Sequence, residues 1–299
     1  KLAYQFLGMV DFIYAKAKFL NQINAQKPQI TKEPNIVIRN ARHPILDIKL
    51  KKSGSSIVPL NITLNQEQRI VLISGPNAGG KSVALKTIAL LQYMLQSGMN
   101  IPVGDGSSFT IFRNIFIDIG DEQSIENDLS TYSSHLNNMN YFLKFADKKT
   151  LLLIDEFGSG TEPQYGGALA EAILEKLNQF RAYGVITTHY GNLKKFANEN
   201  EGLVNASMIF DMDKLEPLFI LETGKPGSSY ALEIASKREI PEDIIQKAKN
   251  LVGVDQIKLD KLLKETERDK LEISKQKAQL EKKLRNIEKT REEYEKLVY

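Results

Sequence analysis

Apolar residues along the first two thirds of the chain alternate between helical and strand-like spacing. At the amino terminus they recur every three or four residues, which predicts one long helix over residues 1–27 that ends before Pro28. Short aliphatic runs predict strands at 35–39, 61–64, 70–73, 151–154 and 185–188, and helical patterns follow at 83–96 and 167–177. This order is typical of an α/β domain with a mostly parallel sheet covered on both faces.

The pattern changes after Gly224. A turn over 224–229 precedes two short helical patterns at 230–235 and 241–251, and charged residues dominate from about Ile257 onward. An incomplete heptad seam runs through Leu259, Ile273, Leu280, Ile287 and Tyr294. Both a coiled coil and a solvated helical extension remain open for this last segment.

The run that follows the strand at 70–73 carries the clearest chemistry. It matches the phosphate-loop motif G-x-x-x-x-G-K-S in full and is followed by a helix, the order in which such loops occur. Its glycines let backbone N–H groups surround phosphates, Lys81 reaches the terminal phosphates, and Ser82 offers a hydroxyl to Mg²⁺. The predicted ATP-binding residues are Gly75, Pro76, Asn77, Ala78, Gly79, Gly80, Lys81, Ser82 and Val83.

Two further strand ends carry polar groups that we expect at the same edge of the sheet. Asp155 and Glu156 end the run 151–154; we predict that Asp155 supports the Mg²⁺ shell and that Glu156 is the general base that orients the attacking water. His189 follows the strand at 185–188, where it is a plausible γ-phosphate sensor. Lys81, Glu156 and His189 are therefore the predicted catalytic residues.

Ser130 and Thr131 stand at the start of a helical run. A Ser-Thr pair in this place is first of all a helix N-cap, and the alternative is that the helix start faces a phosphate. The residues alone favour the cap.

The composition excludes several classes of protein and of binding site. The 299 residues contain no Cys, which excludes a disulfide framework and thiolate metal sites, and the net charge of +3 is too small to argue for nucleic-acid binding. No apolar run is long enough to span a bilayer and no signal peptide is visible, so we expect a cytoplasmic protein without a membrane partner. The chain begins without Met inside a helical pattern, as a piece of a longer protein would.

The phosphate loop, with Asn77 after Gly-Pro, resembles that of the MutS ATPases, and the resemblance runs from about residue 42 to 251. Further matching motifs are Arg-His-Pro at 42–44, Ser-Thr-Tyr at 130–132, the acidic loop at 155–161 and Thr-His-Tyr at 188–190. The segments 96–102, 119–126, 129–135 and 224–235 are most similar to the type 2 MutS proteins.

The resemblance implies a P-loop NTPase of the ABC-ATPase type that works as a homodimer with composite sites. Ser130 and Thr131 would then act in trans on the γ-phosphate of the partner's ATP, and Ile57 or Val58 would contact the adenine. It also divides the chain into the end of a lever helix (1–32), the ATPase domain (33–223), a dimerising helical segment (224–252) and the charged helix (253–299).

The function implied is an ATP-hydrolysing, Mg²⁺-dependent motor acting on branched DNA to limit recombination, or on stalled ribosomes. Type 2 MutS proteins usually carry a C-terminal Smr nuclease domain, which does not follow before Tyr299, so we expect no nuclease activity from this chain. One alternative is the ATPase domain of a mismatch-repair MutS. The other, an SMC-like structural ATPase, fits less well because its coiled coil lies between the phosphate loop and the acidic strand.

Overall fold

The protein is described by a computed structural model that covers residues 1–76, 79–120, 128–211, 214, 216–227 and 231–252, with isolated positions between 269 and 287. It forms two compact units, residues 1–211 with 216–227, and residues 212–215 with 228–299.

A six-stranded sheet is the centre of the first unit. All of its neighbouring pairs are parallel except that of the edge strand β10, which runs antiparallel to β9. The strand order is β10 (Glu216–Thr223), β9 (Gly202–Asp211), β4 (Gln68–Ser74), β8 (Tyr183–Thr187), β7 (Thr150–Ile154) and β6 (Asn114–Asp118). The predicted strands at 70–73, 151–154 and 185–188 all belong to it, which confirms the mostly parallel α/β sheet.

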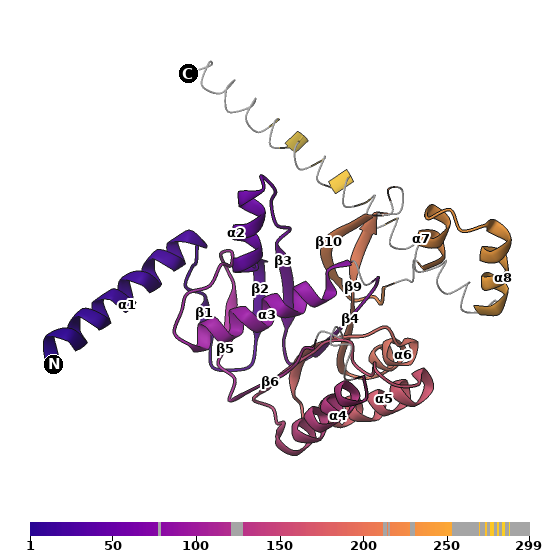
Figure 1. The fold of residues 1–299 in the computed structure, drawn as a ribbon, viewed down its shortest axis with the longest axis horizontal. Coiled ribbons are helices and arrows are strands. Elements are labelled where there is room, and N and C mark those ends of the chain that lie inside the picture. The colour runs from indigo at the N-terminus through magenta and orange to yellow at the C-terminus, as the bar shows by residue number, and fades with distance from the viewer. Residues whose placement is uncertain are drawn as a thin grey trace. The chain divides into compact units, whose positions relative to one another are not determined.

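Two core clusters cover the opposite faces of this sheet, because successive side chains of a strand point to opposite sides. Val71 packs in the cluster that contains Ile88 of α3 (Lys81–Gln96), whereas Leu72 packs in the cluster that contains Leu174 of α5 (Pro163–Gln179). The helices α4 (Asp128–Phe145) and α6 (Gly191–Glu199) contribute to the second cluster, and Figure 1 shows them beside α5. The predicted two-sided covering is confirmed.

A second, four-stranded sheet was not foreseen. Its order is β1 (Gln29–Thr31), β5 (Ser108–Thr110), β2 (Ile36–Ala41) and β3 (Leu60–Leu64), with α2 (Pro44–Lys52) in the connection between β2 and β3. The predicted strands at 35–39 and 61–64 therefore pair antiparallel with each other and stand outside the main sheet. Short strands give no signal in the sequence that says which sheet they join.

The first helix is shorter than the spacing predicted. Helix α1 spans Leu2–Gln22, five residues less than the expected end, because Asn24 adopts the left-handed conformation with φ 49° and breaks the helical path. None of its residues is buried, and Leu2 and Tyr4 are each 83% exposed. The chain then turns into the core at Ile23, which is 1% exposed.

The second unit contains the two helices expected after the turn at 224–229. These are α7 (Ala231–Lys237) and α8 (Glu242–Val252). Most of the charged segment over 253–299 lies outside the described residues, so the choice between coiled coil and solvated helix stays open. Among the residues described, no helix has the length and apolarity that crossing a membrane requires.

Candidate nucleotide-binding site

The glycine loop joins the carboxyl end of β4 to the amino end of α3. Gly75 and Gly80 adopt positive φ angles of 126° and 93°, conformations that favour glycine. Lys81 follows as the first residue of α3 and is only 3% exposed. Its Nζ donates to the carbonyl oxygens of Gly75 at 2.7 Å and Pro76 at 3.0 Å. Asn77 and Ala78 lie outside the described residues.

Lys81 is a cation held in a place that disfavours its charge. Burial lowers the pKa of its ammonium group to about 8, and the positive charge of Lys194 acts in the same direction. The negative charges of Glu156 and Asp155 oppose this shift only in part. A cation whose charged form is disfavoured by burial is well suited to an anionic ligand such as a phosphate group.

Thr187 of β8 positions both predicted acidic residues. Its hydroxyl donates to Oδ1 of Asp155 and accepts from the backbone N–H of Glu156 at 2.8 Å. Asp155 is 7% exposed. Glu156 has a positive φ of 48°, a conformation that non-glycine residues seldom adopt and that recurs at functional sites. Thr187, which the sequence offered only as part of a strand, thus orients the pair.

His189 faces the same site. Partial burial of its ring, then the positive charges of Lys81 and Lys194, lower the pKa of His189 to about 4. The imidazole is therefore neutral at neutral pH in the free chain. Lys194 of α6 was not foreseen; its Nζ donates to the carbonyl oxygen of Gly227 at 3.0 Å, which fixes a second cation beside the site.

Tyr190, next to His189, holds the loop that follows the acidic pair. Its hydroxyl donates to the carbonyl oxygen of Gly158 at 3.0 Å. Gly158 has a φ of 91°, and a Cβ there would lie 2.9 Å from the ring of Tyr190. The loop that follows the acidic pair is therefore tied directly to the strand end that carries His189.

An apolar cavity of about 320 Å³ lies beside the phosphate loop. The predicted adenine contacts Ile57 and Val58 line it, and so do Gly80 and Val83 at the loop end. The rest of its wall is made by Ala41, His43, Leu46, Leu50, Ser56, Leu60, Ala84, Thr87, Met208 and Phe219. The structure thus brings the predicted base-contacting and phosphate-contacting residues to one place.

Phe219 is an aromatic wall residue that no motif in the sequence indicated. It lies where the pairing of β10 with β9 shifts register, and its positive φ of 56° accompanies that bulge. A Cβ on Gly80 would meet the Phe219 ring at 3.1 Å. The bulge therefore aims an aromatic ring at the end of the phosphate loop.

Ser130 and Thr131 lie in the first turn of α4, which begins at Asp128. The favoured prediction that this pair caps the helix is therefore wrong, because the helix begins two residues earlier. Their side chains and residues 121–127 lie outside the described part. The same helix is fixed to β6 by Asp118, whose carboxylate bonds to Nδ1 of His135 at 2.7 Å and to the amide of Asn138 at 2.8 Å.

Comparison with known proteins identifies this arrangement. Residues 71–255 match the family description "MutS domain V". The chain belongs to the MutS family. The match begins inside β4, so it includes the phosphate loop, the acidic strand end and the segment around His189.

Relatives named Endonuclease MutS2 align along almost the whole chain. The protein from Pelotomaculum thermopropionicum is 42% identical over 97% of this chain, and that from Halothermothrix orenii is 40% identical over 98%. One from Staphylococcus aureus is 39% identical over 99%. This chain spans little more than a third, 36–37%, of the length of these three relatives. It is therefore similar to the ATPase part of a type 2 MutS protein.

Proposed function

We propose that this chain binds and hydrolyses ATP with Mg²⁺ as the motor of a dimeric type 2 MutS protein. The observation that carries the proposal is the juxtaposition of an apolar cavity, a glycine loop with buried Lys81, and the acidic pair at the end of β7. The apolar cavity suits an adenine ring, the glycine loop with Lys81 suits a triphosphate, and the acidic pair suits the shell of a metal ion.

The base would enter the cavity between the side of α2 and the ring of Phe219. Stacking on an aromatic side chain stabilises a base by about 1–3 kcal/mol. Ile57 and Val58 would cover the base from the connection between α2 and β3. The triphosphate would then follow the loop toward Lys81, whose ammonium would exchange its bonds to Gly75 and Pro76 for phosphate oxygens.

The residues present fit a Mg²⁺ ion. The hydroxyl of Ser82, at the second position of α3, and the carboxylate of Asp155 are oxygen donors of the kind that Mg²⁺ prefers. The ion would neutralise charge on the phosphates. The hydrogen bond from Thr187 orients the Asp155 carboxylate for this role.

Glu156 would accept the proton of the attacking water, and His189 would donate an N–H to the γ-phosphate as the neutral imidazole. The pKa of about 4 supports this protonation state, since the ring carries no charge in the free chain near pH 7. Lys81 and Lys194 would offset the negative charge that develops on the transferred group.

Glu156→Gln tests the assignment of the base. The amide keeps the size of the side chain but cannot take a proton, so hydrolysis should fall at least about a hundredfold while ATP binding is retained. The measurements are steady-state phosphate release and equilibrium ATP binding. Glu175→Gln, which changes an exposed Glu within α5, is the matched control. Unchanged turnover in Glu156→Gln would remove this residue from the mechanism.

We propose that Ser130 and Thr131 act in trans at a composite site, as the resemblance to the MutS ATPases implies. Asp118 fixes the direction of α4 through its bonds to His135 and Asn138. Mixing Ser130→Ala chains with Lys81→Ala chains should leave one intact site in each heterodimer. Random pairing in an equal mixture makes about half of the dimers heterodimers, so activity should return to roughly a quarter of that of the unmodified dimer. No recovery at any mixing ratio would contradict action in trans.

For the longer protein we propose an action on branched DNA that limits recombination. The names of the relatives support the type 2 branch over a mismatch-repair MutS or an SMC-like ATPase. Action on stalled ribosomes stays a prediction of the sequence. For this chain we propose nucleotide hydrolysis and not nuclease activity.

A further inference from the structure

A second polar pocket, with a volume of about 570 Å³, lies in the first unit away from the cavity described above. Five cationic side chains line it, and Glu33 is the acidic one. The five are Lys32, Arg69, Lys148, Lys149 and Arg181, which come from four separate segments of the chain. The remaining lining includes the hydroxyl residues Thr110 and Tyr183 and the apolar Pro34 and Ile111. We refer to it below as the basic pocket.

The basic pocket lies at the amino ends of the parallel strands. Arg69 is the second residue of β4, Lys149 directly precedes β7, and Tyr183 begins β8. The phosphate loop follows the other end of β4, which has seven residues. A strand of this length spans roughly 20 Å, so a ligand at one end need not displace a ligand at the other.

The positive charge in the basic pocket is poorly compensated. Within the described part of the chain, none of its five cations forms a salt bridge. Burial, followed by the positive charge of Arg181, lowers the pKa of Arg69, while Tyr183 and then Glu201 oppose this shift. The Nε of Arg69 is buried and has no hydrogen-bond partner among described residues.

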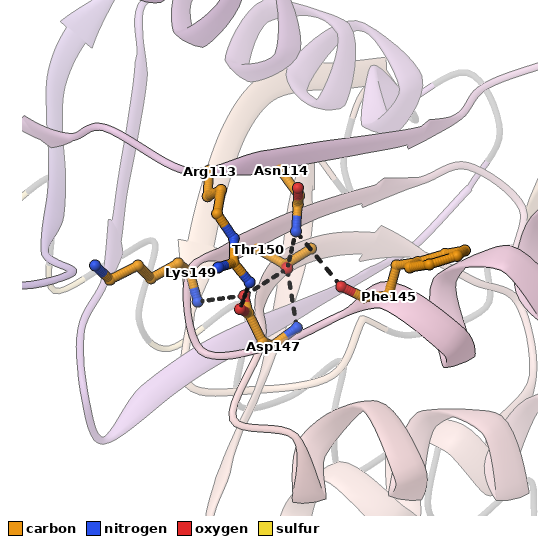
Figure 2. Close-up of polar contacts among 6 residues, drawn as sticks. All are labelled: Arg113, Asn114, Phe145, Asp147, Lys149 and Thr150. Atoms are coloured by element: carbon orange, nitrogen blue, oxygen red, sulfur yellow. Dashed lines mark hydrogen bonds and ion pairs between the residues drawn. The ribbon is translucent and has the colours of Figure 1, made fainter.

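Asp147, the carboxylate next to Lys148 in the chain, is already occupied, as Figure 2 shows. It accepts from the guanidinium of Arg113, from the backbone N–H of Lys149 at 2.9 Å and from the hydroxyl of Thr150 at 3.0 Å. The side chain of Lys149 extends away from this network (Figure 2). Asp147 therefore shapes the turn that presents Lys148 and Lys149 without pairing with either ammonium group.

We infer that the basic pocket is a binding site for the phosphate backbone of a nucleic acid. Lys and Arg from several segments make the contacts that dominate such binding, and their spread over one pocket suits a chain of phosphates better than a single ion. The exposed Ile111 offers apolar contact to a sugar or base. The inference rests on the proposed function for the choice of nucleic acid as the polyanion.

The test is the binding of a fluorescently labelled oligonucleotide, single-stranded or duplex, to the 299-residue chain, followed by anisotropy at low salt. Lys148→Glu with Lys149→Glu should weaken binding at least about tenfold and should lower the slope of log K against log salt by about two. Lys49→Glu with Lys52→Glu, on the exposed side of α2, is the control with the same change of net charge. It should alter binding less than about twofold.

Three results would overturn the inference. One is the absence of oligonucleotide binding by the unmodified chain, and another is equal weakening by the control pair, which would indicate general attraction to a basic surface. The third is an unchanged affinity in the pocket variant. ATP hydrolysis, measured in the same samples, should be unaltered by both pairs of substitutions. If the unmodified chain hydrolysed no ATP, the proposed function would be contradicted, while the oligonucleotide affinities would still test the basic pocket. Circular dichroism melting verifies that each variant is folded.

Discussion

The two ends of the six-stranded sheet differ in how they hold positive charge. At the carboxyl ends, Lys81 is buried, hydrogen-bonded to the glycine loop and faced by Asp155 and Glu156. At the amino ends, five cations gather around an open pocket and form no salt bridge among the described residues. Hydrolysis requires groups fixed in place, whereas the attraction of a phosphate backbone requires mainly charge at the surface.

The largest effect should come from Lys81→Ala. It removes the buried ammonium from the carboxyl end, so ATP affinity should fall at least about a hundredfold. Oligonucleotide affinity should stay within about twofold, because the basic pocket lies at the other end of β4. The Lys148→Glu, Lys149→Glu pair should instead weaken oligonucleotide binding and leave ATP affinity unchanged. Titrations of both ligands against both variants measure this, and a parallel loss of both affinities in Lys81→Ala would show that the two ends are one site.

The next effect is a dependence of ATP affinity on pH. The free chain holds Lys81 with a pKa of about 8, and a bound triphosphate favours the charged form. Above about pH 8 the ammonium must be reprotonated for binding, so the dissociation constant for ATP should rise by up to about tenfold per pH unit. The measurement is an ATP titration between about pH 7 and 9.5. The Lys81→Ala variant should lack this dependence, and an equal slope in that variant would assign it to another group.

The smallest effect should follow from Asp118→Asn. The backbone carbonyl of Asp118 accepts from the N–H of Asp155 at 2.9 Å, while its side chain bonds to His135 and Asn138 of α4. Loss of the buried charge should lower the free energy of unfolding by about 2 kcal/mol. It should also reduce kcat a few-fold with little change in KM, because α4 is less firmly placed while the ATP cavity is untouched. Denaturant melts and steady-state kinetics separate the two effects. An altered KM with an unchanged kcat would contradict a positioning role.

Local signals predicted the chemistry at the carboxyl ends. A strand, a glycine loop and a helix are consecutive in the chain, so the place of Lys81 follows from the motif. The acidic pair and His189 each end a buried aliphatic run, and parallel strands bring such ends to one edge. The helical patterns after residue 224 were visible for the same reason, since their periodicity is confined to a few turns.

Contacts between distant segments could not be predicted in this way. Phe219 reaches the phosphate loop through a bulge in an edge strand, and Lys194 reaches the site from α6. The basic pocket collects residues from positions 32 to 183, whose sequence neighbours give no sign of a common place. The N-cap prediction for Ser130 and Thr131 failed because the start of a helix depends on residues before it and on its packing.

The amino-acid sequence alone was therefore enough to predict the phosphate loop, the acidic strand end and the parallel sheet. These features depend on motifs and periodicities that extend over only a few residues. Tertiary structure alone decided which aromatic ring covers the cavity, which threonine orients the acidic pair, and where uncompensated positive charge gathers. Those features depend on which elements pack together, and packing brings side chains into contact regardless of their separation along the chain.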